Sequence, residues 1–133
     1  MNEQSPAAVA AAYFDALARG DVPAAMGLLS PQVVWHQPGA NRFTGDHAGP
    51  DGVGALLSGM MEVSEGSFRL VVTGPPMVNG ELVAVPVRFT GSRAGASMEM
   101  AGVDLLTIRD GTIVEVHLFS QDGPIEDTFW GKA

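Results

Sequence analysis

The sequence predicts an α+β domain in which three helices precede a run of antiparallel strands. Apolar residues recur at helical spacing in the first half of the chain and alternate in the second half. The longest alternating stretch, residues 98–119, is typical of a β-hairpin that turns at Arg109-Asp110-Gly111, because Asp-Gly accepts positive φ at little cost. A bent sheet covered by helices on one side encloses an apolar concavity, so a small-molecule site is expected between the two layers.

Length and charge restrict the classes of protein. The chain of 133 residues, 46% hydrophobic, is expected to form a single domain over residues 1–133. Its formal net charge of −8 disfavours nucleic acid and anionic membranes as partners. No apolar run approaches the roughly 20 residues of a membrane span, and the N-terminus does not resemble a signal peptide. The absence of cysteine excludes disulfides and thiol chemistry, and the cytoplasm is the expected compartment.

The helices are recognised by their boundaries. Pro6, after a serine cap, begins a first helix that ends at Gly20 and places Tyr13 on its buried stripe. Asp21 caps a second, short helix. Pro50 begins a third helix with a stripe of methionine and leucine, which packing must stabilise because glycines interrupt it.

Strands follow from alternation. Besides the hairpin they are expected over residues 32–37, 68–73 and 82–90, with 42–44 as a further short extended candidate. Pro86 has no backbone N–H, so a bulge or a sheet edge is expected there. In the tail, an apolar flap is expected from Ile125, Phe129 and Trp130, and the acidic residues Asp122, Glu126 and Asp127 are expected to face water.

Asp104 is the anomaly of the hairpin. It is the one ionisable group on a face that otherwise carries Met98, Met100, Gly102, Leu106 and Ile108. A buried carboxylate is costly unless it is paired, hydrogen-bonded or protonated. Two interpretations are open: a partner elsewhere or a bulge resolves the conflict, or Asp104 is a polar group at the bottom of an apolar pocket.

Several local pieces, in this order and spacing, suggest a family: Tyr13…Gly20-Asp21, Trp35-His36-Gln37-Pro38-Gly39, Thr73-Gly74-Pro75, Val85-Pro86-Val87-Arg88-Phe89 and Val103-Asp104…Asp110-Gly111. The chain resembles the nuclear-transport-factor-2-like (NTF2-like) superfamily, which includes ketosteroid isomerases and SnoaL-like polyketide cyclases. The resemblance implies a cone-shaped, cystatin-like fold with three N-terminal helices packed on a curved mixed or antiparallel sheet. It also implies a homodimer formed through the sheet.

The resemblance carries over to the site only in part. Tyr13 and Asp104 stand where steroid isomerases have the tyrosine and the aspartate that donate hydrogen bonds to a developing enolate. Gln37 stands at the position of the family's proton-shuttling aspartate, and an amide cannot act as a general base. Leu29 and Leu57 replace two supporting tyrosines.

Histidines offer a different base. SnoaL-like cyclases use His and Asp pairs in the cavity, so His36 or His117 with Asp104 would serve if either faced inward. His117 is expected to face outward, whereas a bulge near Pro38 would turn His36 inward. No spacing of His, Asp and Glu predicts a metal site, and no cofactor is predicted.

Three hypotheses follow. The first is a cofactor-independent isomerase, cyclase or dehydratase acting on a hydrophobic ketone, with catalytic candidates Tyr13, His36, Gln37 and Asp104. The second is a binding protein that holds a hydrophobic ligand in the same cavity without chemistry. The third is a structural or interaction protein whose interior is plugged by Trp35, Phe89, Phe119, Phe129 and Trp130. The expected ligand-contacting residues are Trp35, Leu57, Val87, Phe89, Gly102, Val116, Leu118 and Trp130.

Overall fold

The computed structural model describes residues 4–132, which form four helices and seven strands. The helices are α1 (Pro6–Ala18), α2 (Val22–Met26), α3 (Gly49–Val63) and α4 (Gly123–Trp130). The strands are β1 (Leu29–Gln37), β2 (Gly45–Ala48), β3 (Arg69–Val72), β4 (Met77–Asn79), β5 (Leu82–Arg93), β6 (Ala96–Arg109) and β7 (Thr112–Ser120). None of these helices is both long and apolar enough to cross a membrane.

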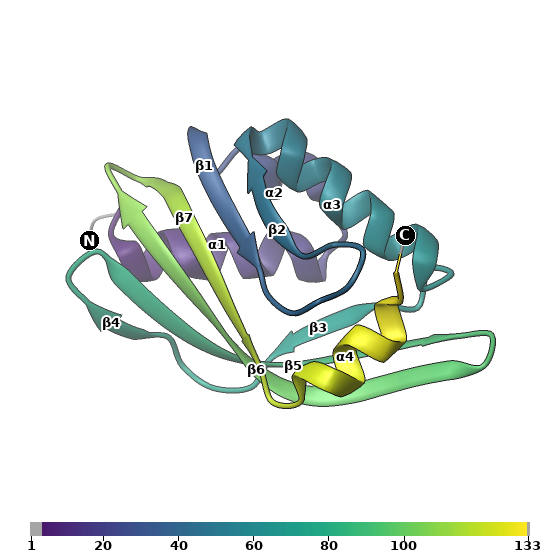
Figure 1. The fold of residues 1–133 in the computed structure, drawn as a ribbon. Helices are drawn as coiled ribbons and strands as arrows, with labels where there is room; N and C mark the ends of the chain where they lie inside the picture. The colour runs from purple at the N-terminus through teal and green to yellow at the C-terminus, as the bar shows by residue number, and fades with distance from the viewer. Residues whose placement is uncertain (1–3, 133) are drawn as a thin grey trace.

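The strands form one mixed sheet in the order β2-β1-β7-β6-β5-β3, and β4 pairs with β5 beyond the end of β3. β1 and β7 are parallel, and the other pairs are antiparallel. The sheet curves around α1, while α3 packs on β1 and α4 on β6 (Figure 1). The predicted α+β architecture, with three N-terminal helices on a curved sheet, is confirmed. The fourth helix is the tail.

The predicted hairpin is formed by β6 and β7. Asp110 (φ 53°) and Gly111 (φ 81°) both have positive φ, as a two-residue turn of type I′ requires. The register of the two strands shifts beside Thr107, which breaks the strict alternation. Ile113 and Val116, which strict alternation would place on opposite faces, are therefore both fully buried.

Pro86 lies where β5 changes its neighbour. The register of β5 with β6 runs through Pro86 without interruption, so no bulge is present. β3 ends at Val72 and β4 begins at Met77, and the Thr73 N–H donates to the Pro86 carbonyl at 2.9 Å. Pro86 therefore lies at a local edge of the sheet, between the end of β3 and the start of β4. A missing backbone N–H costs no strand-to-strand hydrogen bond there.

The tail folds back as predicted, but as a helix that closes the interior. Phe129 and Trp130 are buried, and the Trp130 ring meets Phe43 edge-on at 5.2 Å. Two expectations for the tail are wrong. Ile125 is 49% exposed, and Glu126, expected in water, is 6% exposed. Helical spacing explains both, because Glu126 lies on the same face of α4 as Phe129 and Trp130.

Candidate functional site

Tyr13 is the first polar group of the interior. The Ser5 side chain caps α1 by accepting from the Ala8 N–H, and the helix then directs Tyr13 into the core, where it is 1% exposed. Its hydroxyl makes no hydrogen bond within residues 4–132. Burial, and then the charge of Asp104, raise the pKa of Tyr13, so the hydroxyl keeps its proton and remains a donor.

Asp104 is the second polar group of the interior. It lies on the inner face of β6 and is 7% exposed, and the registers with β5 and β7 are regular on either side of it. No group in the described chain donates a hydrogen bond to its carboxyl group. Neither a bulge nor a hydrogen-bonding partner therefore accounts for this burial. Burial, and then the charge of Glu126, raise the pKa of Asp104 to about 7, which keeps a carboxylic acid available near neutrality.

Glu126 is the interior residue that sequence analysis missed. Its carboxylate accepts a hydrogen bond from the Ser120 hydroxyl at 2.5 Å and another from Trp130 Nε1 at 3.1 Å. The sequence does contain a sign of this helix, because Asp122 is a typical N-cap residue. In the structure its side chain accepts a hydrogen bond from the Ile125 N–H at the start of α4. Recognising that helix start would have placed Glu126 one turn before the apolar Trp130.

Gln37 and Trp35 extend the site along the inner face of β1. Both are buried, at 4% and 5% exposure, and Trp35 Nε1 donates to Gln37 Oε1 at 2.9 Å. This bond holds the amide at the end of the strand with its oxygen already occupied. Gln37 therefore presents a donor to the interior, but no group that accepts a proton.

The predicted ligand-contacting residues lie on the interior side of the fold, where α4 completes the covering. Val87, Phe89, Val116 and Trp130 are buried, and Leu57, Gly102 and Leu118 are half-buried. A Cβ on Gly102 would lie 2.6 Å from the Phe119 carbonyl oxygen, so only glycine fits there. Of the five aromatic residues considered as plugs, Trp35, Phe89, Phe129 and Trp130 are buried, and Phe119 is 56% exposed.

Two surface hollows lie apart from these polar groups. A groove of about 370 Å³ runs between α1 and β3, and a second hollow lies beside α4 and the turn from β5 to β6. Neither is lined by Tyr13 or Asp104. Neither hollow therefore leads directly to Tyr13 and Asp104.

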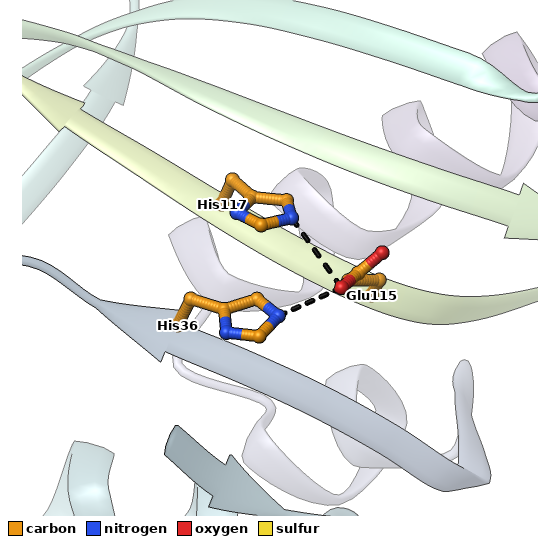
Figure 2. Close-up of side chains that lie close together, drawn as sticks. All are labelled: His36, Glu115 and His117. Carbon is orange, nitrogen blue, oxygen red and sulfur yellow. Dashed lines mark hydrogen bonds and ion pairs between the residues drawn. The ribbon is translucent and has the colours of Figure 1, made fainter. Parts of the chain in front are cut away.

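His36 lies on the opposite face of the sheet. The expected inward turn is wrong, because β1 pairs regularly with β2 and β7 at this position. His36 Nδ1 lies 2.7 Å from Asp46 Oδ1, and Nε2 lies 2.7 Å from Glu115 Oε2. Its ring stacks on His117 at 4.3 Å, and His117 faces outward as predicted (Figure 2). His36 is therefore not brought together with Tyr13 and Asp104.

The outer residues perturb one another's protonation. The hydrogen bond with Glu115 is the main cause that raises the pKa of His36, and Asp46 adds to it. The same bond holds the pKa of Glu115 below its usual range. Sequence spacing did not reveal this cluster, because its members come from strands far apart in the chain.

The chain shares its curved mixed sheet with an NTF2-like protein from Burkholderia xenovorans, which is 19% identical, with a TM-score of 0.77 over 98% of each chain. Residues 10–116 match the model of the SnoaL-like domain, so the chain belongs to the SnoaL-like family. No curated protein matches the sequence.

Solved structures share the fold. A protein of unknown function with a cystatin-like fold from Xanthomonas campestris is 44% identical, with a TM-score of 0.91, over 96% of this chain and 99% of that chain. TerC, co-crystallised with polyporic acid, is 19% identical, with a TM-score of 0.81 over 94% and 98% of the two chains. A proposed polyketide cyclase from X. campestris is 21% identical, with a TM-score of 0.70 over 89% and 91%. The last two establish a common fold only.

Proposed function

We propose that the protein is a cofactor-independent enzyme of the isomerase or cyclase type that acts on a hydrophobic, polyketide-like or steroid-like ketone. The observation that carries this proposal is the pair Tyr13 and Asp104, two buried polar groups without hydrogen-bond partners in residues 4–132. Native proteins seldom leave a buried donor unpaired, since it costs roughly 1–3 kcal/mol. A ligand oxygen placed between the two groups would remove that cost.

The chemistry follows from the protonation of the pair. Tyr13 keeps its proton, and Asp104, with a pKa of about 7, is protonated in about half of the molecules at neutral pH. Both then donate hydrogen bonds to the carbonyl oxygen of the ketone. When a proton leaves the carbon beside the carbonyl, negative charge develops on that oxygen, and preorganised donors in a dry site stabilise it.

Glu126 is the proton acceptor in this proposal. Gln37 has no basic group, and His36 lies on the other face of the sheet. Glu126 is the other buried carboxylate of the described chain, and its charge is what helps to keep the proton on Asp104. In this proposal Asp104 donates a hydrogen bond to the ketone oxygen and Glu126 accepts the proton that leaves the neighbouring carbon. Gln37 orients the substrate with its amide N–H groups.

The relatives favour the same substrate class without fixing it. The family is SnoaL-like, and the structural relatives include a proposed polyketide cyclase and a protein co-crystallised with polyporic acid. We also propose that the protein is a homodimer formed through the sheet, as the resemblance to the NTF2-like superfamily implies. Light scattering that gives the mass of a single chain would contradict the dimer.

The test of the site is a fluorescence titration with a phenolic steroid that mimics a dienolate. The wild type should bind it, and Asp104→Asn and Tyr13→Phe should each weaken binding at least tenfold, because each variant loses one donor to the oxyanion. Glu126→Gln should keep binding and lose turnover of the ketones that a subsequent screen identifies. Absence of binding by the wild type to every phenolic probe would overturn the proposed site.

A binding protein for a hydrophobic small molecule is the second candidate. Gln37 at the position of the family's base favours it, because the amide preserves polarity and removes proton transfer. This candidate predicts ligand binding in the wild type with no turnover of any ketone. Glu126→Gln would then change neither affinity nor product formation.

A further inference from the structure

The strongest unassigned cluster lies on the outer sheet face, on the parallel strands β1 and β7. His36 and His117 are register partners, so their rings stand side by side, 13° from parallel. Glu115 precedes His117 by two residues and shares its face of β7. Figure 2 shows both imidazoles turned toward one Glu115 carboxylate oxygen.

We propose that His36, Glu115 and His117 form a binding site for a divalent transition-metal ion, with Zn²⁺ the best match. Each residue offers one ligand atom, and these atoms all lie within 4.8 Å of one another. His36 Nε2 and His117 Nε2 lie 2.7 Å and 3.4 Å from the same oxygen, Glu115 Oε2. The site is distinct from the proposed enzyme site, which lies on the other face of the sheet.

Small rotations of the three side chains would bring their ligand atoms to bonding distance of one ion. Tetrahedral zinc, with Zn–N bonds of about 2.0–2.1 Å, holds its donor atoms about 3.3 Å apart. The three side chains are 29%, 42% and 43% exposed, so their rotamers are free to adjust and solvent reaches the position between them. The backbone of the two paired strands would not need to move.

Asp46 provides the carboxylate that metal-binding histidines usually have at the ring nitrogen that does not bind the ion. Its carboxylate lies 2.7 Å from His36 Nδ1, the ring nitrogen that faces away from Glu115. A carboxylate at Nδ1 holds a proton there, so Nε2 is the nitrogen that binds a metal once it releases the proton that it donates to Glu115. Asp46 lies on β2, a third strand, and is not itself one of the three ligand residues.

The donor set selects the class of ion. Two imidazoles and one carboxylate suit zinc, iron, nickel and copper, whereas calcium and magnesium prefer oxygen ligands throughout. Three ligands from one chain leave a fourth position open to water. The carboxylates of Glu115 and Asp46 compensate the charge of a divalent cation.

The test measures zinc binding to chelator-treated, untagged protein by isothermal titration calorimetry. The expected result is one Zn²⁺ per chain and no heat from Mg²⁺. His117→Gln and Glu115→Gln should each lower zinc affinity at least tenfold. Asp46→Asn should lower it about 10–100-fold, because the His36 ring would lose the carboxylate that orients it. His47→Gln is the matched control, because His47 lies on the neighbouring strand with its Nε2 bonded to the Phe43 carbonyl.

Histidine NMR on the wild type makes the test independent of variant folding. Zinc should shift the ring nitrogens of His36 and His117 and leave those of His47 unchanged. Wild-type zinc affinity in both Glu115→Gln and His117→Gln would overturn the proposal. Equal shifts of all three histidines, or equal loss of binding in His47→Gln, would also overturn it.

Discussion

The two faces of the sheet hold their polar side chains in opposite ways. On the inner face, Tyr13 and Asp104 are buried without hydrogen-bond partners in the described chain, and the pKa of each is raised by burial. On the outer face, His36 is half-buried and is bonded through both ring nitrogens. The inner groups lack what a ligand would supply, whereas the outer groups already satisfy one another.

This difference arises within single strands. Gln37 follows His36 on β1, yet the amide faces the interior and the imidazole faces outward, because successive side chains of a strand alternate. In the same way, Val116 of β7 packs inside between the outward-facing Glu115 and His117. One short segment therefore contributes to two sites of different chemistry.

The largest effect on the free energy of unfolding is expected when a buried aromatic side chain of the interior is removed. Trp130 is fully buried, so Trp130→Ala should lower the free energy of unfolding by about 3–5 kcal/mol, as large-to-small core substitutions do. The matched control is Phe119→Ala on the outer face, where the ring is 56% exposed and the cost should be about 0.5 kcal/mol. Urea unfolding of both variants checks this, and equal losses would contradict the assignment of Trp130 to the core.

The next largest effect is the pH dependence of stability that results from protonation of Asp104. Because the folded protein raises the pKa of Asp104 from 3.8 to about 7, the unfolded chain releases this proton at lower pH than the folded one. The free energy of unfolding should therefore fall as pH rises from about 4 to about 7 and level off above that. The full loss is on the order of 4 kcal/mol.

Asp104→Asn should remove this dependence, because an amide does not titrate in that range. The measurement is urea unfolding of wild type and Asp104→Asn between pH 4 and pH 8, with the difference between the two curves as the readout. The variant should gain stability relative to the wild type as pH rises. Parallel curves would show that Asp104 ionises normally in the folded state.

The fold and the interior candidate site apart from Glu126 could be predicted because local periodicity encodes them. Helical spacing placed Tyr13 on the buried stripe of α1, and alternation placed Asp104 on the inner face of β6. Glu126 was missed because a tail of one short helix gives too few repeats for periodicity to show, although its capping residue was visible.

The outer cluster could not be predicted from local patterns. His36 and Glu115 are 79 residues apart in the chain, and only the parallel register of β1 with β7 brings them together. Sequence alternation shows which face a residue occupies, but it does not show which strand lies beside it. For the same reason, the shift beside Thr107 that buried Ile113 was invisible in the sequence.

The smallest effect is expected from the outer ion pair in metal-free buffer. His36 and Glu115 are 29% and 42% exposed, so solvent screens their attraction. A double-mutant cycle with His36→Asn and Glu115→Gln, measured with chelator present, should give a coupling free energy of about 0.2–1 kcal/mol. Added salt should lower it further. A coupling above about 2 kcal/mol would break the contrast between the faces, because the outer polar cluster would then contribute to stability on the scale of the interior.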